Sequence, residues 1–227
     1  MSTYIIAFLV SEFVARSDGY FLVHARPEFY DQTKFAYEAN KDLLEALDRA
    51  NGIPYMSMGN DKMALAAIPD FSAGAMENWG LLTYRERILL WAEGESTLSA
   101  KQSIASVITH EQAHMWWGDL VTCDWWGYAW LNEGFASYHE YISTHDVYPE
   151  LEMDKQFAVD FTQSVMVQDS TNNTNRMTEE ETNTEAELAR SFNRITYNKA
   201  PAVIRMFAHA IGLEDFEKAQ HEYLKKL

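Results

Sequence analysis

The stretch THEQAHMWWGDL, residues 109–120, places two histidines four residues apart, with a glutamate directly after the first. On an α-helix, residues i and i+4 lie on one face. His110 and His114 can therefore direct two imidazoles at one point, with Glu111 beside them, which is a zinc-binding pattern. A buried helix can also carry these residues by chance, so a metal site needs a third ligand elsewhere in the chain.

Glu133, in the stretch WLNEGFASY, is the candidate for that ligand. It follows His114 by 19 residues, which is enough for the chain to leave one helix, turn and begin a second helix beside the first. A catalytic zinc ion takes three protein ligands and leaves a fourth position for water. His110, His114 and Glu133 supply such a set, and burying them unpaired would be costly. We therefore expect one Zn²⁺ per chain.

Two more polar residues follow on the second predicted helix. Glu140 lies seven residues after Glu133, about two helical turns, and so on the same face. It could accept a hydrogen bond from a ligand histidine, and a solvated glutamate is an equally good interpretation. His139 points elsewhere on this helix, which leaves no evident fourth protein ligand and disfavours a purely structural zinc site.

Length and composition limit the class of protein. The chain has 227 residues, of which 47% are hydrophobic and 14% aromatic, as expected for a globular protein. Its net charge of −16 argues against binding to nucleic acid or to an anionic membrane surface. The single cysteine, Cys123, excludes an internal disulfide. The apolar run at 4–10 is too short to span a membrane, and Asn172 begins an NNT glycosylation pattern.

The first 95 residues predict a small sheet crossed by one helix. β-branched and aromatic residues gather in four segments that are separated by turn residues. An apolar stripe followed by Gly52 indicates a helix between the second and third of them. We expect strands over residues 3–13, 20–25, 62–68 and 81–91, and a helix over 31–50.

The remainder of the chain predicts helices around a polar loop at 170–187. The first helix should begin with a capping box formed by Ser99 and Gln102 and end near Gly118. Further helices are expected over about 131–149, 151–168, 197–212 and 213–227. A sheet followed by helices is the arrangement of an α+β fold. Five tryptophans within residues 116–130 are expected mainly in the core, although they could also line a cleft.

The motifs together resemble one family. GAMENWG at 74–80, HEQAH at 110–114 and NEG at 132–134 are similar to those of the zinc aminopeptidases related to aminopeptidase N. These enzymes are gluzincins with a thermolysin-like catalytic domain. ITYNKAPAVIRM at 195–206 extends the resemblance over most of the chain. It implies a small sheet lobe followed by a mainly helical lobe, with the zinc site between them.

The resemblance also implies catalytic roles. His110, His114 and Glu133 match the zinc ligands, and Glu111 matches the general base. Tyr197 matches the tyrosine that stabilises the tetrahedral intermediate. Here the Tyr-x-Lys triplet is followed by alanine and then Pro201, so Tyr197 must lie near the start of its helix.

The GAMEN residues are expected to bind the substrate. Glu77 matches the residue that binds the free α-amine, and a fixed carboxylate is the natural partner of an ammonium group. Gly74 and Ala75 match backbone that pairs with the peptide, and Met76 and Asn78 complete the motif. Without the resemblance, a loop glutamate or a lone tyrosine is more often structural.

The resulting hypothesis is an aminopeptidase that acts on peptides with a free N-terminus. Residues 1–13 would be the last strand of a missing N-terminal β-domain, and 14–227 the catalytic domain, with other flanking domains outside this chain. The resemblance favours a membrane-anchored extracellular enzyme. The alternatives are an epoxide hydrolase of the same family, which GAMEN in place of GGMEN disfavours, and a catalytically weak or silent fragment that acts as a receptor or binding module.

Overall fold

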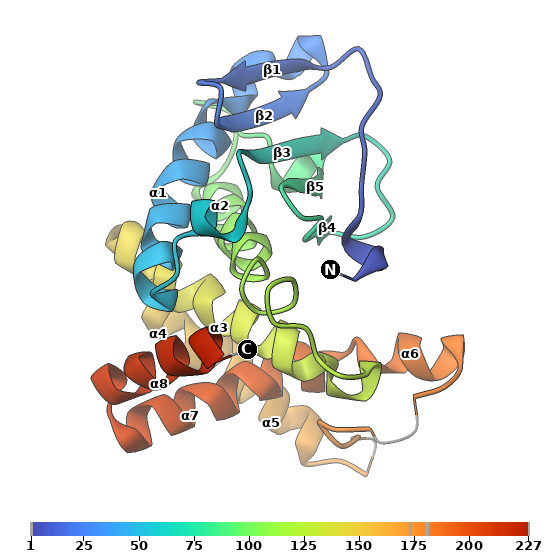
Figure 1. The fold of residues 1–227 in the computed structure, drawn as a ribbon, viewed down its shortest axis with the longest axis vertical. Coiled ribbons are helices and arrows are strands. Elements are labelled where there is room, and N and C mark those ends of the chain that lie inside the picture. Colours follow the sequence, from blue (N-terminus) through green and yellow to red (C-terminus); the bar gives the residue numbers. More distant parts are fainter. Residues whose placement is uncertain (1, 173, 180–181, 227) are drawn as a thin grey trace.

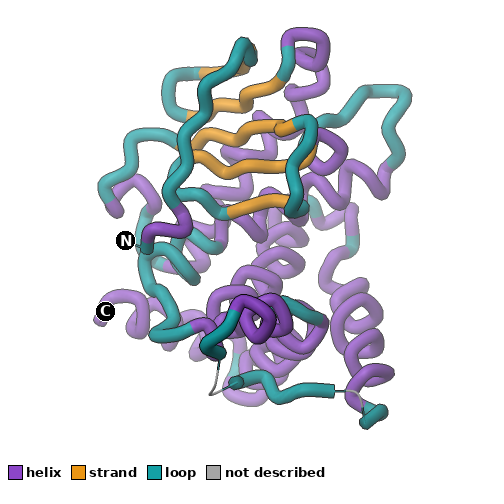
Figure 2. The backbone as a smooth tube through the Cα atoms, turned by 90° about the vertical axis from the view of Figure 1, so that its right-hand side faces the viewer, coloured by secondary structure: helices purple, strands orange, loops and turns teal. Residues whose placement is uncertain are grey.

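A computed structural model describes residues 2–172, 174–179 and 182–226. A sheet lobe lies at one end of the molecule and a helical lobe at the other (Figure 1). Helices α1 (Lys34–Asn51) and α2 (Leu98–Ala113) cover one face of the sheet, while the N-terminal segment runs along the other face (Figures 1 and 2). This arrangement confirms the α+β, thermolysin-like fold.

Strand β4 (Ala75–Met76), which belongs to the GAMEN motif, forms one edge of the sheet. The strand order is β1-β2-β3-β5-β4, with parallel pairing of β2 to β3 and β3 to β5 and antiparallel pairing at both edges. The central strand, β3, is buried at all but its last position, as expected for a strand covered on both faces. The strands are β1 (Val14–Ser17), β2 (Phe21–Ala25), β3 (Met63–Ile68), β4 (Ala75–Met76) and β5 (Leu81–Arg85).

The helical lobe is built around α2 and α3. The second half of α2, which contains His110, is buried almost throughout, and so is His114, the residue that follows its end. The helix α3 packs against both α2 and α7. Short π-helical turns at Ala158–Gln163 and Ile195–Lys199 precede α5 and α7. The remaining helices are α3 (Ala129–Val147), α4 (Met153–Phe157), α5 (Ser164–Asp169), α6 (Glu185–Ser191), α7 (Ala200–Ile211) and α8 (Leu213–Lys226).

The main hydrophobic core joins the sheet to α1 and α2. Leu43 of α1, Leu65 of β3 and Ile108 of α2 belong to it and are fully buried. Trp116 is also fully buried there, and its indole N–H donates to the Ile53 carbonyl at 2.8 Å. A smaller cluster joins α3 to α4 and α7 through Tyr138, Phe157, Phe161, Ile204 and Ala208. Both zinc-motif helices are therefore held from several sides.

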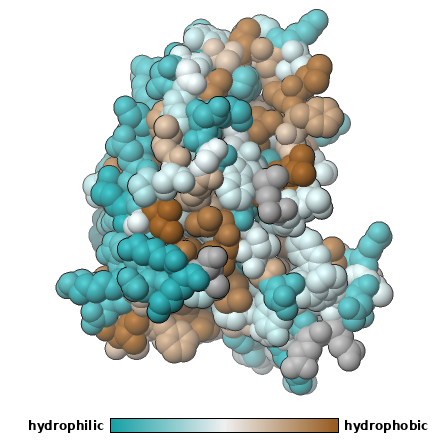
Figure 3. Space-filling model, viewed as in Figure 1, coloured by the Kyte–Doolittle hydropathy of each residue, from teal (hydrophilic) through white to brown (hydrophobic). Residues whose placement is uncertain are grey.

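The strand expected over 3–13 is wrong. Thr3–Ile5 forms a 3-10 turn. The residues from there to Phe13 join no strand of the described sheet, whose two edge strands are β1 and β4. The Trp79 amide donates to the Ile5 carbonyl at 3.2 Å and ties this segment to the loop after β4. Ile6, Phe8 and Val10 are exposed, and Figure 3 shows apolar side chains along this segment. The assignment of 1–13 to a separate domain stays a prediction.

Several element boundaries also differ from the sequence predictions. Helix α2 begins at Leu98 because the Thr97 hydroxyl, and not that of Ser99, caps it by accepting from the Ala100 amide. It ends at Ala113, five residues before Gly118. The β-strand expected over 81–91 ends at Arg85, where a turn places Glu86 in an ion pair with Arg26 at 2.7 Å. The helix expected over 151–168 is divided into α4, a π-helical turn and α5.

His139 joins α3 to α8 by hydrogen bonds. Its side chain is buried, its Nδ1 lies 3.1 Å from the Ser143 hydroxyl, and its Nε2 lies 3.1 Å from the Gln220 amide nitrogen. The amide donates to Nε2, so Nδ1 carries the proton and donates to Ser143. His139 thus points away from Glu133, as the sequence suggested.

This network predicts that acid destabilises the chain. Burial lowers the pKa of His139 to about 4, whereas an unperturbed histidine has a pKa of about 6.5. Between these two pH values the unfolded chain therefore binds a proton at His139 and the folded chain does not. The free energy of unfolding should therefore fall as the pH is lowered from about 6.5 to about 4, by roughly 3 kcal/mol from this residue. Urea denaturation of His139→Gln across this range should show a smaller loss than the wild type. The exposed control His209→Gln should keep the full loss, and equal losses for both variants would contradict this origin.

Candidate metal centre and active site

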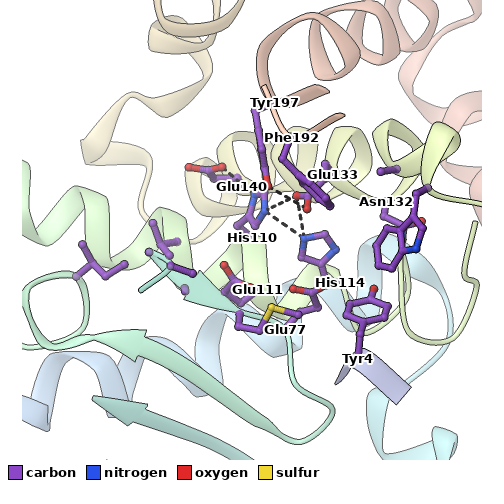
Figure 4. Close-up of a pocket in the computed structure, with 18 of the residues that line it drawn as sticks. Tyr4, Glu77, His110, Glu111, His114, Asn132, Glu133, Glu140, Phe192 and Tyr197 are labelled. Atoms are coloured by element: carbon purple, nitrogen blue, oxygen red, sulfur yellow. Dashed lines mark hydrogen bonds and ion pairs between the residues drawn. The ribbon is translucent and has the colours of Figure 1, made fainter. Parts of the chain in front are cut away.

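A cavity of about 510 Å³ lies between the two lobes. One wall is the edge of the sheet, from Ala73 to Glu77, and another is formed by α2 and α3. The turn before α7 and the N-terminal Tyr4 complete it (Figure 4). The cavity therefore collects side chains from segments that are far apart in the sequence.

Three donor atoms converge in this cavity. His110 Nε2, His114 Nε2 and Glu133 Oε2 lie 3.2 Å from one another in each of the three pairs. His110 comes from the last turn of α2, His114 is the residue that follows this helix, and Glu133 comes from the first turns of α3 (Figure 4). Ligands at 2.0–2.1 Å in a tetrahedral zinc site are separated by about 3.3–3.4 Å. The triangle therefore has the dimensions of three zinc ligands.

The partners of the two imidazoles support the same conclusion. His114 Nδ1 donates to the Trp117 carbonyl at 2.9 Å, and His110 Nδ1 donates to Glu140 Oε2 at 3.1 Å. With their protons on Nδ1, both rings present an Nε2 lone pair to Glu133. Three atoms with lone pairs then face one point and repel one another, and a bound cation would remove this repulsion. Glu140 is thus the histidine partner that the spacing allowed, and not a solvated surface residue.

The electrostatics of this cluster also favour a cation. Burial lowers the pKa of His114, but the Glu133 carboxylate outweighs burial and raises it to about 9. Burial likewise opposes the ionisation of Glu133, yet the two imidazoles bring its pKa well below the usual range. The buried carboxylate is therefore compensated by positive charge, which protons on the imidazoles or a metal ion in their place can supply.

Two further carboxyl groups face the same cavity. Glu111 and Glu77 are buried, and a carboxylate oxygen of each lies within 4.8 Å of the other and of a ring nitrogen of His114. Burial raises the pKa of Glu111 to about 8, against the effect of the two imidazoles. Asp119 is a third buried acid nearby, and burial together with Glu77 raises its pKa to about 8. Three acidic side chains therefore gather in and beside this part of the cavity, and burial favours the protonated form of two of them, Glu111 and Asp119.

The GAMEN residues divide into two groups. Gly74, Ala75, Met76 and Glu77 line the cavity, and the two middle residues form β4, which pairs with β5. Asn78 lies outside the lining, and its side-chain oxygen accepts from the Thr83 hydroxyl at 2.9 Å. The structure therefore does not bring Asn78 to the cavity, but uses it to hold the turn between β4 and β5.

Tyr197 reaches the three-donor cluster (His110, His114 and Glu133) from the π-helical turn before α7. Its hydroxyl donates to Glu133 Oε1 at 3.2 Å. Pro201 lies in the first turn of α7, where a missing N–H costs little. Tyr197 thus stands just before the helix start, as the proline requires. Burial raises the pKa of Tyr197 far above its usual value, so its hydroxyl keeps its proton.

Sequence reasoning missed part of the cavity lining. Tyr4 and Phe192 come from segments that carry no recognisable motif. Asn132 precedes Glu133 in the NEG motif and had no role of its own in the sequence prediction. Trp126 was only one member of the tryptophan-rich stretch, in which Trp116 is buried as expected and Trp125 is half exposed. Only the tertiary arrangement distinguishes these roles.

Comparison with known proteins places the chain in a family. The model of the peptidase family M1 domain matches residues 35–227, so the chain belongs to peptidase family M1. This confirms the resemblance to the aminopeptidase N family.

Individual relatives match almost the whole chain. Membrane alanyl aminopeptidase of Manduca sexta is 40% identical over 99% of the chain, and endoplasmic reticulum aminopeptidase 2 of Bos taurus is 40% identical over 100%. Aminopeptidase M1 of Arabidopsis thaliana is 40% identical over 99%. The matches cover 23%, 24% and 26% of these relatives, so the chain spans about a quarter of their length.

Proposed function

We propose that this chain contains the catalytic centre of a zinc aminopeptidase, which hydrolyses the N-terminal bond of peptides. One observation supports this most directly: the three-donor cluster shares a cavity with two buried carboxyl groups, Glu111 and Glu77. A metal site alone needs only the cluster. The two additional carboxyl groups supply a base and a site for a cationic substrate group.

His110, His114 and Glu133 would hold one Zn²⁺. When bound, the ion supplies a Lewis acid that acidifies a coordinated water and polarises a carbonyl group. Glu140 and the Trp117 carbonyl orient the two imidazoles, and such partners commonly change metal affinity about 10- to 100-fold. Because these groups accept hydrogen bonds from Nδ1, the lone pair of each Nε2 stays available to bind the metal.

Glu111 and Tyr197 would act on the peptide bond. Glu111 is close enough to the cluster to take the proton of the attacking water and pass it to the leaving amine. The Tyr197 hydroxyl, now directed at Glu133, would donate to the carbonyl oxygen as negative charge develops there. The buried end of α2 fixes Glu111, and the π-helical turn that carries Tyr197 is anchored by the buried Ile195 and Thr196.

Glu77 would bind the substrate α-ammonium group. It lies at the end of the sheet-lobe wall, and its oxygen, with Glu111 and His114, forms a second close group of cation-binding atoms. An N-terminus brings the positive charge that this group lacks, whereas an internal peptide bond brings none. The arrangement therefore favours cleavage at the chain end.

Substitution of Glu77 tests this proposal. In Glu77→Ala, kcat/KM for leucine p-nitroanilide should fall by roughly 10- to 100-fold, because a charge-assisted hydrogen bond is lost. Zinc content should stay at the wild-type level. The N-acetylated substrate should be a poor substrate for both proteins. If Glu77→Ala cleaves the free and acetylated substrates in the wild-type ratio, Glu77 does not bind the amine.

The proposed location follows the relatives. The names of two of them refer to the membrane and to the endoplasmic reticulum, and we propose a membrane-anchored or secretory enzyme. The helices of the described residues include none with the length and apolar character of a membrane span. Asn172, the predicted glycosylation position, is exposed, which is compatible with modification in such a compartment.

A further inference from the structure

Two buried threonines join the helices that carry the metal-binding side chains. Thr109 of α2 and Thr144 of α3 are both fully buried, and their hydroxyl oxygens lie 2.6 Å apart. The Thr109 hydroxyl also lies 3.0 Å from the Ala105 carbonyl, which can only accept. Thr109 therefore donates its proton to Ala105, and the Thr144 hydroxyl donates to Thr109. Neither threonine lines the cavity, so the pair can affect it only through neighbouring residues.

The pair lies beside the metal-binding side chains on both helices. Thr109 directly precedes His110, whose Nε2 is one of the three converging donor atoms. On α3, Glu140 lies two turns after Glu133, and Thr144 lies one turn further on the same face. Glu140 is the residue that accepts a hydrogen bond from His110 Nδ1 (Figure 4). The hydroxyl pair therefore continues the row of polar contacts by which the end of α2 meets α3.

A buried hydroxyl pair fixes how two helices are placed against each other. Apolar side chains such as the neighbouring Ile104 and Ile108, both fully buried, tolerate several packing arrangements. The hydroxyl pair is satisfied in only one of them. A shift of α2 along α3 would separate the two hydroxyls inside the core, where a polar group without a partner is costly. Buried polar pairs are used in this way to set the register of packed helices.

We propose that Thr109 and Thr144 are positioning residues of the metal centre, which hold α2 and α3 in the register that gives the three donor atoms their 3.2 Å spacing. This inference rests on the proposed function, because that proposal makes His110, His114 and Glu133 the zinc ligands. The pair does not contact the metal and takes no part in the chemical step. Its loss should weaken zinc binding and change the coordination geometry, beyond any loss of fold stability.

The test measures metal binding by the purified chain, so it does not depend on turnover. Thr109→Val removes the hydroxyl at almost constant volume, whereas Thr109→Ser keeps the hydroxyl. Competition with a chromophoric chelator gives the zinc affinity, and the absorption spectrum of bound Co²⁺ reports the coordination geometry. In Thr109→Val the zinc dissociation constant should rise by roughly 3- to 10-fold, less than for a direct partner of a ligand, and the Co²⁺ spectrum should change. Thr109→Ser should retain both wild-type properties.

Thr33→Val is the matched control. Thr33 is also fully buried, and its hydroxyl likewise donates to a carbonyl, that of Tyr30, and accepts from a side chain, that of Arg16. It lies just before α1 and outside the cavity lining. This variant should lower the urea midpoint of unfolding but keep the wild-type zinc affinity and Co²⁺ spectrum. An equal loss of zinc affinity in Thr33→Val would contradict the inference, because zinc binding would then only follow stability.

A second substitution keeps the inference testable if Thr109→Val folds poorly, which circular dichroism would show. Thr144→Val should have the same effect, and the double variant no larger one, because each change removes the same hydrogen bond. Wild-type zinc affinity in a folded single variant, or additive losses in the double variant, would overturn the inference. A wild-type chain that binds no zinc would instead refute the metal centre of the proposed function, and the role of this pair with it.

Discussion

Glu111→Gln is expected to remove hydrolysis while leaving the metal bound. The amide has nearly the shape of the carboxylate but cannot accept a proton from water, so kcat should fall by roughly 10²- to 10⁴-fold. Glu111 is not one of the three converging donor atoms, so zinc content should remain at about one equivalent per chain. Turnover of leucine p-nitroanilide and metal analysis on the same preparation provide the two measurements.

A matched control shows whether this loss is local. Glu150→Gln makes the same chemical change at an exposed position in the loop between α3 and α4. It should retain wild-type turnover and zinc content. If Glu111→Gln keeps more than about a tenth of the wild-type kcat, a base catalyst at this position is excluded, because the expected contribution is at least about 100-fold.

His114→Ala is expected to lose the metal itself. His114 is almost fully buried, and its Nε2 is one corner of the 3.2 Å triangle. Removing one of three ligands should weaken zinc binding by roughly 100-fold or more, since even partners of ligands contribute about 10- to 100-fold. Metal analysis after dialysis should therefore give far less than one equivalent, and turnover should fall with it.

His145→Ala is the control for this experiment. His145 lies on α3 outside the cavity lining, where its ring nitrogen is 3.4 Å from Asp154. This variant should retain its metal. Circular dichroism would show whether His114→Ala still folds, so that metal loss is not confused with unfolding. Full zinc retention by folded His114→Ala would show that this residue is not a ligand.

Local patterns predicted that His110, His114 and Glu133 come together, because their geometry is mostly helical. The i, i+4 spacing fixes His110 and His114 on one face, and seven residues bring Glu140 beneath Glu133 on α3. The remaining requirement, that α2 and α3 pack together, follows from their burial. The order of sheet and helices was likewise visible in the periodicity of apolar residues. Such features depend on short stretches whose geometry varies little.

Features that depend on distant partners could not be predicted. The segment 3–13 has the composition of a strand, but a strand forms only where another strand offers hydrogen bonds. Tyr4 and Glu77 line the same cavity although they are 73 positions apart in the sequence, and neither segment predicts the position of the other. The choice of Thr97 over Ser99 as helix cap depends on backbone angles that the residue types do not specify.

The close spacing of Glu77 and Glu111 also sets a length scale for the substrate. Their oxygens lie within 4.8 Å of each other. In a peptide, the α-nitrogen and carbonyl carbon of the first residue are about 2.5 Å apart, and each further residue adds up to about 3.6 Å. On the proposed function, an amine held by Glu77 therefore brings the first carbonyl, and not the second, to the base. The distance between the two carboxyl groups would then determine that each turnover removes one residue from the peptide.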